Sequence, residues 1–232
     1  MIVFDIIKRF YNLSNNERFI KSLRNQGVNI GGGVIFRSPF TTRIDLSRPS
    51  LVTIGNNVDI NKYFQILTHD YSAKVFKYAY HDFLNSSGTV NIGSNIYFGT
   101  NVIVLKVVTI GDNCIIAAGS VVSKSIPPNS VAAGVPCRVV CSLDDYYKKR
   151  KEQSLKEAVE YVKSIIERFG RDPYPKELHE EFVWFVDNSN YNDYASVMPL
   201  DSQLGVAKND YLDKHKALFK NLEEFFGYCK SN

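Results

Sequence analysis

Apolar residues recur at every sixth position through the middle of the chain, and a second apolar track runs two positions earlier. Six residues advance an α-helix by about 600°, so such positions share no helical face. In extended backbone they all point the same way, because six is a multiple of two. The pattern therefore predicts short strands with one buried face. The earlier track is Val52, Val58, Phe64, Val90, Ile96, Val102, Val108 and Cys114, and the later one is Ile54, Ile60, Ile66, Ile92, Phe98, Val104, Ile110 and Ile116.

Glycine together with asparagine or aspartate marks the ends of these short segments, as in "IGNN" and "IGDN". These residue types tolerate the positive φ of tight corners. A repeat of six is too short to hold a strand and return as a hairpin. Each strand must therefore stack on the strand one full turn earlier, roughly 4.8 Å away. The sequence predicts a mainly β fold, a parallel β-helix of hexapeptide repeats.

The period of six breaks once, between Ile66 and Ile92, which are 26 residues apart. About 20 residues must leave the coil and return there. We assign this excursion to residues 68–89. Because long excursions on rigid scaffolds often carry function, we expect it to help form a binding pocket. Its aromatic residues include Tyr71, Phe76, Tyr78, Tyr80 and Phe83.

The flanking segments predict helices. Val3, Ile6, Ile7 and Phe10 fit one face of a short amphipathic helix. We expect it to pack on the protein; the alternative is that it rests on a membrane surface. We therefore divide the chain into an N-terminal helical segment (1–26), a hexapeptide-repeat β-helix domain (27–140) and a C-terminal helical extension (141–232).

Within the C-terminal extension, apolar residues recur at helical spacing from Leu143 to Phe169, and Gly170 is a fitting stop. The segment 207–228 predicts a further helix, with Leu218, Leu222 and Phe225 on one face.

Composition narrows the function classes. The apolar fraction of 44% and charged fraction of 22% are ordinary for a soluble protein. A formal charge of +4 without a long basic run gives little support for nucleic-acid binding. The chain shows neither a secretory signal pattern nor a run of membrane-spanning length. The four cysteines lack a paired metal-binding spacing, so we expect free thiols in a reducing cytosol.

Histidine is the side chain best suited to acid–base chemistry near neutral pH, and the chain has only four. His69, in "LTHDYS", stands where the coil gives way to the excursion, and an imidazole on a rigid rim suits general-base work on a hydroxyl. Asp70 either orients an imidazole, contacts substrate or simply forms a turn. His81 is a weaker candidate. His179 and His215 are interpreted as solvent-facing helix residues.

Residues 52–140 resemble the hexapeptide-repeat acyltransferases. The run "IGDNCIIAAGSVVSKSIPPNSVAAGVPCRVV" carries the resemblance, which is nearest to galactoside and maltose O-acetyltransferases and to capsular or exopolysaccharide O-acetyltransferases. The resemblance implies a left-handed coil, whereas the usual crossover rule would favour a right-handed one. It also implies acetyl-CoA as cosubstrate and a homotrimer with active sites between subunits.

The resemblance further implies roles for particular residues. His69 corresponds to the catalytic histidine of the family. Thr100 and Ala118 would lie beside the pantetheine arm of CoA. Ser123, Lys124 and Arg138 would lie near its phosphates, where cationic donors match clustered negative charge. The chain departs from the family pattern at four places, where Tyr97 stands for Trp, Val107 for Gly, Cys141 for Arg and Cys137 for Ala.

These observations predict a cytoplasmic, acetyl-CoA-dependent O-acetyltransferase that acts on a sugar or polysaccharide precursor by direct transfer. Three alternatives stay open. The same scaffold could acetylate the amine of an amino sugar, or bind CoA as a non-catalytic scaffold or sensor. A β-helical carbonic anhydrase would need three histidines on zinc, and only His69 and His81 lie near the coil.

Overall fold

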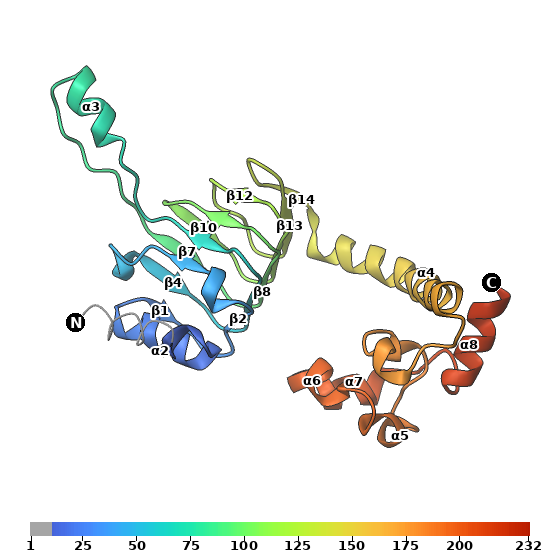
Figure 1. Ribbon diagram of the computed structural model, residues 1–232. Coiled ribbons are helices and arrows are strands. Elements are labelled where there is room, and N and C mark those ends of the chain that lie inside the picture. The colour runs from blue at the N-terminus through green and yellow to red at the C-terminus, as the bar shows by residue number, and fades with distance from the viewer. Residues whose placement is uncertain (1–10) are drawn as a thin grey trace. The chain divides into compact units, whose positions relative to one another are not determined.

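A computed structural model describes residues 11–232 (Figure 1). The helix predicted between Val3 and Phe10 lies outside the described residues. The chain forms two compact units, Met1–Tyr147 and Lys148–Asn232. The first unit holds every strand of the described chain, and the second is helical.

The first unit is built from three sheets whose strands stack along one coil (Figure 1). Neighbouring strands are parallel except for the last pair, β13 with β14. Sheet one contains β1 (Asn29–Ile30), β4 (Val52–Ile54), β7 (Val90–Ile92) and β10 (Val108–Ile110). Sheet two contains β2 (Ile35–Phe36), β5 (Val58–Ile60), β8 (Ile96–Phe98), β11 (Cys114–Ile116), β13 (Ser130–Ala133) and β14 (Arg138–Ser142). Sheet three contains β3 (Arg43–Ile44), β6 (Gln65–Ile66), β9 (Ile103–Val104) and β12 (Val121–Val122).

The register of the strands shows the length of one turn. Val90 pairs with Val108, eighteen residues later, and the same offset joins Ile96 to Cys114 in the second sheet. One turn therefore takes three repeats of six residues, one on each face of a three-sided coil. The predicted parallel β-helix is confirmed.

The core of the first unit lies inside this coil. Every residue of the two apolar tracks is buried, with at most 2% of its surface exposed. Phe64 and Phe98, on successive turns, bring their ring centroids to 4.8 Å. Burial of each such side chain contributes about 1.5–3 kcal/mol. The prediction that a spacing of six marks the buried face is confirmed.

The corners of the coil require left-handed backbone. Asn95 and Asn113 have φ values of +57° and +58° on successive turns. Asn95 Nδ2 donates to Asn113 Oδ1 at 2.8 Å, and Asn113 Nδ2 donates to Asn129 Oδ1 at 2.9 Å. Asparagine adopts this conformation more readily than most residues, so it suits these stacked corner positions. Tyr63 and Val107 adopt it as well, with φ values of +61° and +62°.

A helix closes the first turn of the coil. Helix α2 (Asn16–Asn25) begins after Asn15, whose side chain accepts from the amides of Glu17 and Arg18. Its apolar face joins the coil core through Phe19, Ile20 and Leu23. Short 3₁₀ turns, η1 (Pro39–Thr41) and η2 (Pro49–Leu51), interrupt the early turns.

The excursion leaves the coil between β6 and β7. Val52 pairs with Val90, thirty-eight residues later, so this turn is twenty residues longer than a regular one. The two limbs of the excursion meet at an antiparallel bridge between His69 and Ser87. Helix α3 (Ala73–Ala79) stands at its far end, away from the coil (Figure 1).

The second unit packs helices and turns around a core of its own. Helix α4 (Leu143–Phe169) has the predicted bounds. Its remaining elements are η3 (Pro175–Leu178), η4 (Glu181–Trp184), α5 (Tyr191–Ala195), α6 (Leu200–Leu204), η5 (Gly205–Ala207), α7 (Lys208–Lys214) and α8 (Leu222–Ser231). The core is made by Ala158, Val162, Leu178, Phe182, Phe185, Val186, Tyr191, Met198, Leu200, Phe219, Phe225 and Cys229.

The single helix predicted over 207–228 is wrong. The segment forms α7 and α8, with an irregular stretch between them. Helix α8 begins after Asn221, whose side chain accepts from the amide of Glu224 at 2.9 Å. Phe219 in the stretch between them is buried in the core. Tertiary packing of Phe219 and the Asn221 cap therefore override the helical spacing.

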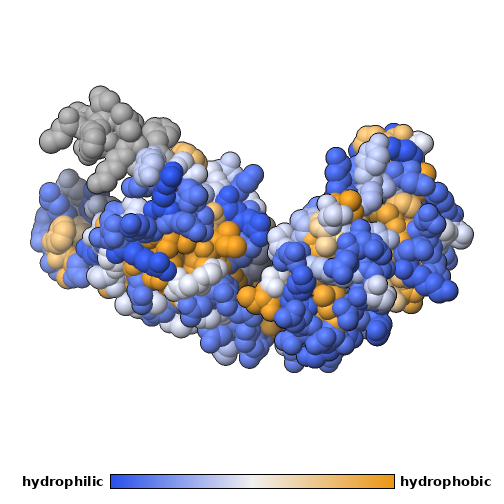
Figure 2. Space-filling view, turned by 90° about the horizontal axis from the view of Figure 1, so that it is seen from below, coloured by the Kyte–Doolittle hydropathy of each residue, from blue (hydrophilic) through white to orange (hydrophobic). Residues whose placement is uncertain are grey.

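Apolar residues reach the surface in patches between hydrophilic ones on the face shown in Figure 2. Within residues 11–232, no helix combines the length and apolar character needed to cross a membrane.

Candidate functional site

One corner of the coil gathers polar residues from successive turns. Strands β3, β6, β9 and β12 are neighbours in sheet three, so the residues that follow them meet at one edge. Asp45 donates its amide to Ile66 O at 3.1 Å, and Leu67 donates to Val104 O at 2.9 Å. We call this edge the site corner. It comprises, turn by turn, Asp45–Ser47, Leu67–Asp70, Leu105–Val107 and Ser123–Lys124.

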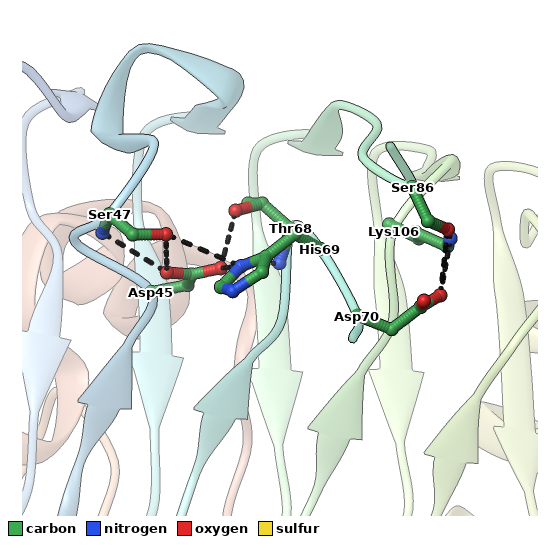
Figure 3. Close-up of polar contacts among 7 residues, drawn as sticks. All are labelled: Asp45, Ser47, Thr68, His69, Asp70, Ser86 and Lys106. Carbon is green, nitrogen blue, oxygen red and sulfur yellow. Dashed lines mark hydrogen bonds and ion pairs between the residues drawn. The ribbon is translucent and has the colours of Figure 1, made fainter. Parts of the chain in front are cut away.

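His69 lies at the site corner with its ring held by the preceding turn. Its Nδ1 is 2.5 Å from Asp45 Oδ2 and 3.3 Å from Ser47 Oγ (Figure 3). The side chains of His69 and Asp45 are 18% and 8% exposed. The Tyr71 ring stands edge-on to the imidazole, with centroids 5.2 Å apart. The imidazole is therefore fixed in orientation and still reachable from solvent.

Asp45 is an ionised acceptor in this arrangement. Its Oδ2 accepts from the amide and the hydroxyl of Thr68, at 3.1 and 2.6 Å, and its Oδ1 accepts from Ser47. Burial would raise the pKa of Asp45, but the hydrogen bonds from Thr68, Ser47 and His69 outweigh it and hold the pKa well below its ordinary value.

An ionised carboxylate can only accept, so the shared proton belongs to Nδ1 of His69. In the neutral imidazole, Nε2 then carries the free lone pair that a general base requires.

Asp70 faces the other way, toward the following turn. Its carboxylate accepts from Lys106 Nζ at 2.5 Å and from Ser86 Oγ at 2.8 Å (Figure 3). It also accepts from the backbone amide of Ser72 at 2.9 Å. Lys106 is the main cause that keeps the pKa of Asp70 well below its ordinary value. In the structure it is Asp45, and not Asp70, that orients the imidazole of His69.

The residues expected near the CoA phosphates lie at two neighbouring corners of the coil. Ser123 and Lys124 follow β12 at the site corner. Arg138 begins β14 in sheet two, where it pairs with Ala133, and it therefore lies at the corner between sheets two and three. All three residues are exposed. Their role as phosphate contacts stays a prediction.

Thr100 and Ala118, expected beside the pantetheine arm, lie at the next corner. They follow β8 and β11, on successive turns, and both are exposed. Gly119 donates its amide to Thr100 O at 2.8 Å. This corner precedes sheet three and the site corner follows it. The outer face of sheet three therefore lies between Thr100 and Ala118 at one end and Ser123 and Lys124 at the other. Their role stays a prediction as well.

His81 and His215 do not lie at the site corner. His81 is exposed in the excursion, with a φ of +52°. The prediction that His215 is a solvent-facing helix residue is wrong: it follows α7, stacks on Tyr211 with ring centroids 4.5 Å apart, and places Nε2 2.7 Å from Val183 O. Across residues 11–232, no group of three or more His, Cys, Asp or Glu is placed to hold a metal ion.

Sequence reasoning missed Asp45 and Lys106. Arg43 pairs with Gln65, an offset of twenty-two residues instead of eighteen, so counting in sixes does not reach Asp45. Lys106 does follow a track residue by two positions, in "VLKVV", and the same spacing puts Lys124 two positions after Val122. That repeat was the available signal for a basic residue on the site corner.

The fold and its repeats define a class, the parallel β-helices built from hexapeptides. The family model described as "Bacterial transferase hexapeptide (six repeats)" matches residues 89–124 of this chain.

Similar proteins carry acetyltransferase names. A galactoside O-acetyltransferase of Escherichia coli is 40% identical over 113 residues, covering 44% of this chain and 52% of that protein. A putative acetyltransferase of Schizosaccharomyces pombe is 35% identical over 120 residues, covering 51% of this chain and 56% of that protein. A maltose O-acetyltransferase structure from Clostridium difficile is 28% identical, with a TM-score of 0.40, and covers 60% of this chain and 83% of that one. The chain thus spans about half the length of the curated relatives it matches.

Proposed function

We propose that this protein is an acetyl-CoA-dependent O-acetyltransferase that acts on a hydroxyl of a sugar or polysaccharide precursor. One observation carries the proposal: Asp45 holds Nδ1 of His69 at 2.5 Å, which leaves Nε2 as a free base at the edge of a rigid coil. The curated relatives over the repeat region, one of them a galactoside O-acetyltransferase, support the reaction class.

The first step is activation of the acceptor. Nε2 of His69 takes the proton from the acceptor hydroxyl as that oxygen attacks the carbonyl carbon of the acetyl thioester. The imidazolium that forms donates from Nδ1 to the ionised carboxylate of Asp45, which stabilises the new positive charge. Thr68 and Ser47 keep this carboxylate in place through their hydrogen bonds.

The second step releases the products. The tetrahedral intermediate collapses, the C–S bond breaks, and the CoA thiolate takes the proton that Nε2 holds. The acetyl group thus passes directly from sulfur to oxygen without an acyl-enzyme. Holding both substrates against one stiff wall supplies the proximity that the transfer needs.

Exposed cations at the site corner and at the neighbouring corner of the coil suit acetyl-CoA. In this proposal Lys124 and Arg138 bind its phosphates, with Ser123 as a further donor, and Thr100 and Ala118 flank the pantetheine arm. Successive turns are roughly 4.8 Å apart, so Ser123 lies about 10 Å along the corner from the turn of His69. The thioester of an extended CoA can reach across this span.

We extend the proposal to the fold and the assembly. The coil is left-handed, three copies form a homotrimer, and the groove for acetyl-CoA lies between neighbouring copies. The protein works in the cytoplasm, which supplies acetyl-CoA, and its four free cysteines suit a reducing compartment. Sedimentation of a particle of three 26.3-kDa chains would support the trimer.

The test is acetyl transfer to a panel of hydroxyl sugars, amino sugars and oligosaccharides, with products identified by mass spectrometry. We expect O-acetylated products from the wild type, and a fall in kcat of about 10²–10⁴-fold in His69→Ala. Acetylation of amines alone would replace the proposal with N-acetylation. Binding of acetyl-CoA without turnover on any acceptor would favour a scaffold, and full activity of His69→Ala would exclude His69 as the base.

A further inference from the structure

His69 and Asp70 are neighbours in the chain whose side chains point to opposite sides (Figure 3). They belong to the outgoing limb of the excursion (68–72), where His69 forms a β-bridge with Ser87, and successive side chains in such extended backbone point to opposite sides. The ring of His69 reaches Asp45 on the preceding turn, and the carboxylate of Asp70 reaches Lys106 on the following turn. Side-chain contacts therefore hold the outgoing limb to the preceding turn and to the following turn at His69 and Asp70.

Lys106 also grips the returning limb of the excursion (86–89). Its ammonium contacts Ser86 Oγ as well as Asp70 Oδ2, and Ser86 Oγ donates to Asp70 at 2.8 Å. One side chain of the coil thus ties together both limbs. We call Asp70, Ser86 and Lys106 the excursion clamp. Aspartate is ionised at neutral pH, and the Lys106 ammonium lowers the pKa of Asp70 further.

The turn that carries Lys106 fits closely against the returning limb. Val107 donates its amide to Thr89 O at 2.9 Å. A Cβ on Gly88 would lie 2.4 Å from Val107 Cγ2, so only glycine fits the limb at this contact. Val107 itself has a φ of +62°, which is strained for a β-branched residue. Such strain persists where the surrounding structure fixes the backbone.

Backbone hydrogen bonds connect the clamp to His69. Asp70 donates its amide to Ser86 O at 3.1 Å, and Gly88 donates to Thr68 O at 2.9 Å. These two bonds bracket the bridge between His69 and Ser87. A shift of the returning limb at Ser86 is therefore passed directly to the backbone of His69.

We propose that Lys106 is a positioning residue that, by tying Asp70 and Ser86 to the coil, fixes the backbone of His69 so that its imidazole meets Asp45. This inference rests on the proposed function, in which His69 is the base. It also gives Asp70 a role as the partner of Lys106 in place of contact with the reacting groups. A misplacement of about 1 Å at a reacting group can cost roughly 10²-fold in rate.

The test uses the full chain with Lys106→Met, Asp70→Asn, their double variant and Lys106→Arg. The control is Lys156→Met, which removes a lysine from an exposed ion pair with Glu160 in the second unit. Three measurements are made on each protein: amide hydrogen exchange at Asp70 and Gly88, nitrogen NMR of the His69 ring, and kcat with KM for acetyl-CoA. Thermal melting checks folding.

We expect Lys106→Met to speed exchange at both amides about tenfold or more, because the limbs open locally. The ring signal should change from protonated Nδ1 toward a mixture of tautomers. We expect kcat to fall about 10–100-fold with KM for acetyl-CoA within about twofold. The double variant should lose no more than Lys106→Met, because the two residues act as one unit. Lys106→Arg should recover much of the loss.

Three results would overturn the inference. Unchanged exchange and an unchanged ring signal in Lys106→Met would show that the clamp does not hold His69. A fall in kcat without either change would mean that Lys106 acts on the reactants. A much larger loss in Asp70→Asn than in Lys106→Met would return Asp70 to the reacting groups. If the wild type transfers no acetyl group, the proposed function fails, while exchange and the ring signal still decide the role of Lys106.

Discussion

Asp45 Oδ2 lies 2.5 Å from Nδ1 of His69, although the two residues are 24 positions apart in the chain. They meet because strands β3 and β6 are neighbours in one sheet and both end at the site corner. The contact fixes the tautomer and the direction of the imidazole. It is therefore the part of the site on which the proposed chemistry depends most directly.

Removing the charge of Asp45 should impair catalysis more than binding. In Asp45→Asn the amide no longer enforces a proton on Nδ1, so Nε2 loses its fixed role as base. We expect kcat to fall by about 10²–10⁴-fold, with KM for acetyl-CoA little changed. Steady-state kinetics with a sugar acceptor would measure both values.

The matched control for this variant is Asp59→Asn. Asp59 also forms an ion pair, with Arg37 at 2.5 Å, but it belongs to β5 in the second sheet. We expect its activity to stay within about twofold of wild type. Equal losses in both variants would mean that Asp45 has no special part in the reaction.

The same carboxylate should make stability depend on pH. The pKa of Asp45 is lower in the folded chain than in the unfolded one, where aspartate titrates near about 3.9. Its stabilising contribution is therefore complete well above that value and is lost as the pH falls below it toward the folded pKa. The difference in free energy of unfolding between wild type and Asp45→Asn should shrink from about pH 6 to about pH 2. Urea unfolding at a series of pH values would measure it, and a constant difference would contradict the linkage.

Replacing Val107 by glycine should stabilise the first unit. Left-handed backbone costs an L-residue about 1–2 kcal/mol, and Val107 has a φ of +62° with 69% of its surface exposed. The greater conformational freedom of glycine in the unfolded chain offsets about 0.5–1 kcal/mol of this stabilisation. We expect a net gain of up to about 1 kcal/mol, measured by urea unfolding.

Val140→Gly is the matched control for that prediction. Val140 is also exposed, at 60%, but lies in the extended strand β14. The same change there should destabilise by about 0.5–1 kcal/mol. Two shifts of the same sign would show that backbone strain at Val107 is not the cause.

Truncating Phe64 should be among the most damaging changes to the coil. Its ring is fully buried and stands 4.8 Å from that of Phe98 on the next turn. Phe64→Ala would leave a cavity between turns and cost about 3–5 kcal/mol. Phe83→Ala removes an equal ring from the excursion, where it is 75% exposed, and should change stability by no more than about 0.5 kcal/mol. Denaturant titration of both variants checks the contrast.

Much of the fold could be predicted because it repeats at short range. A buried residue at every sixth position, as from Ile92 to Ile116, shows both the strand and the face that is buried. Helical spacing and a following glycine likewise placed the helix Leu143–Phe169. The helix predicted over 207–228 failed because a cap at Asn221 and burial of Phe219 are tertiary effects.

The sequence by itself determined the repeat, the corners, the excursion and the choice of His69 as the candidate base. The tertiary structure alone decided which groups surround that histidine. Asp45 and Lys106 reach His69 and Asp70 from the preceding and following turns, 24 and 36 residues away. Those separations depend on an irregular early turn and on the length of the excursion, and neither follows the period of six. When successive turns stack, residues far apart in the chain become neighbours. The partners of His69 are therefore known only from the folded coil.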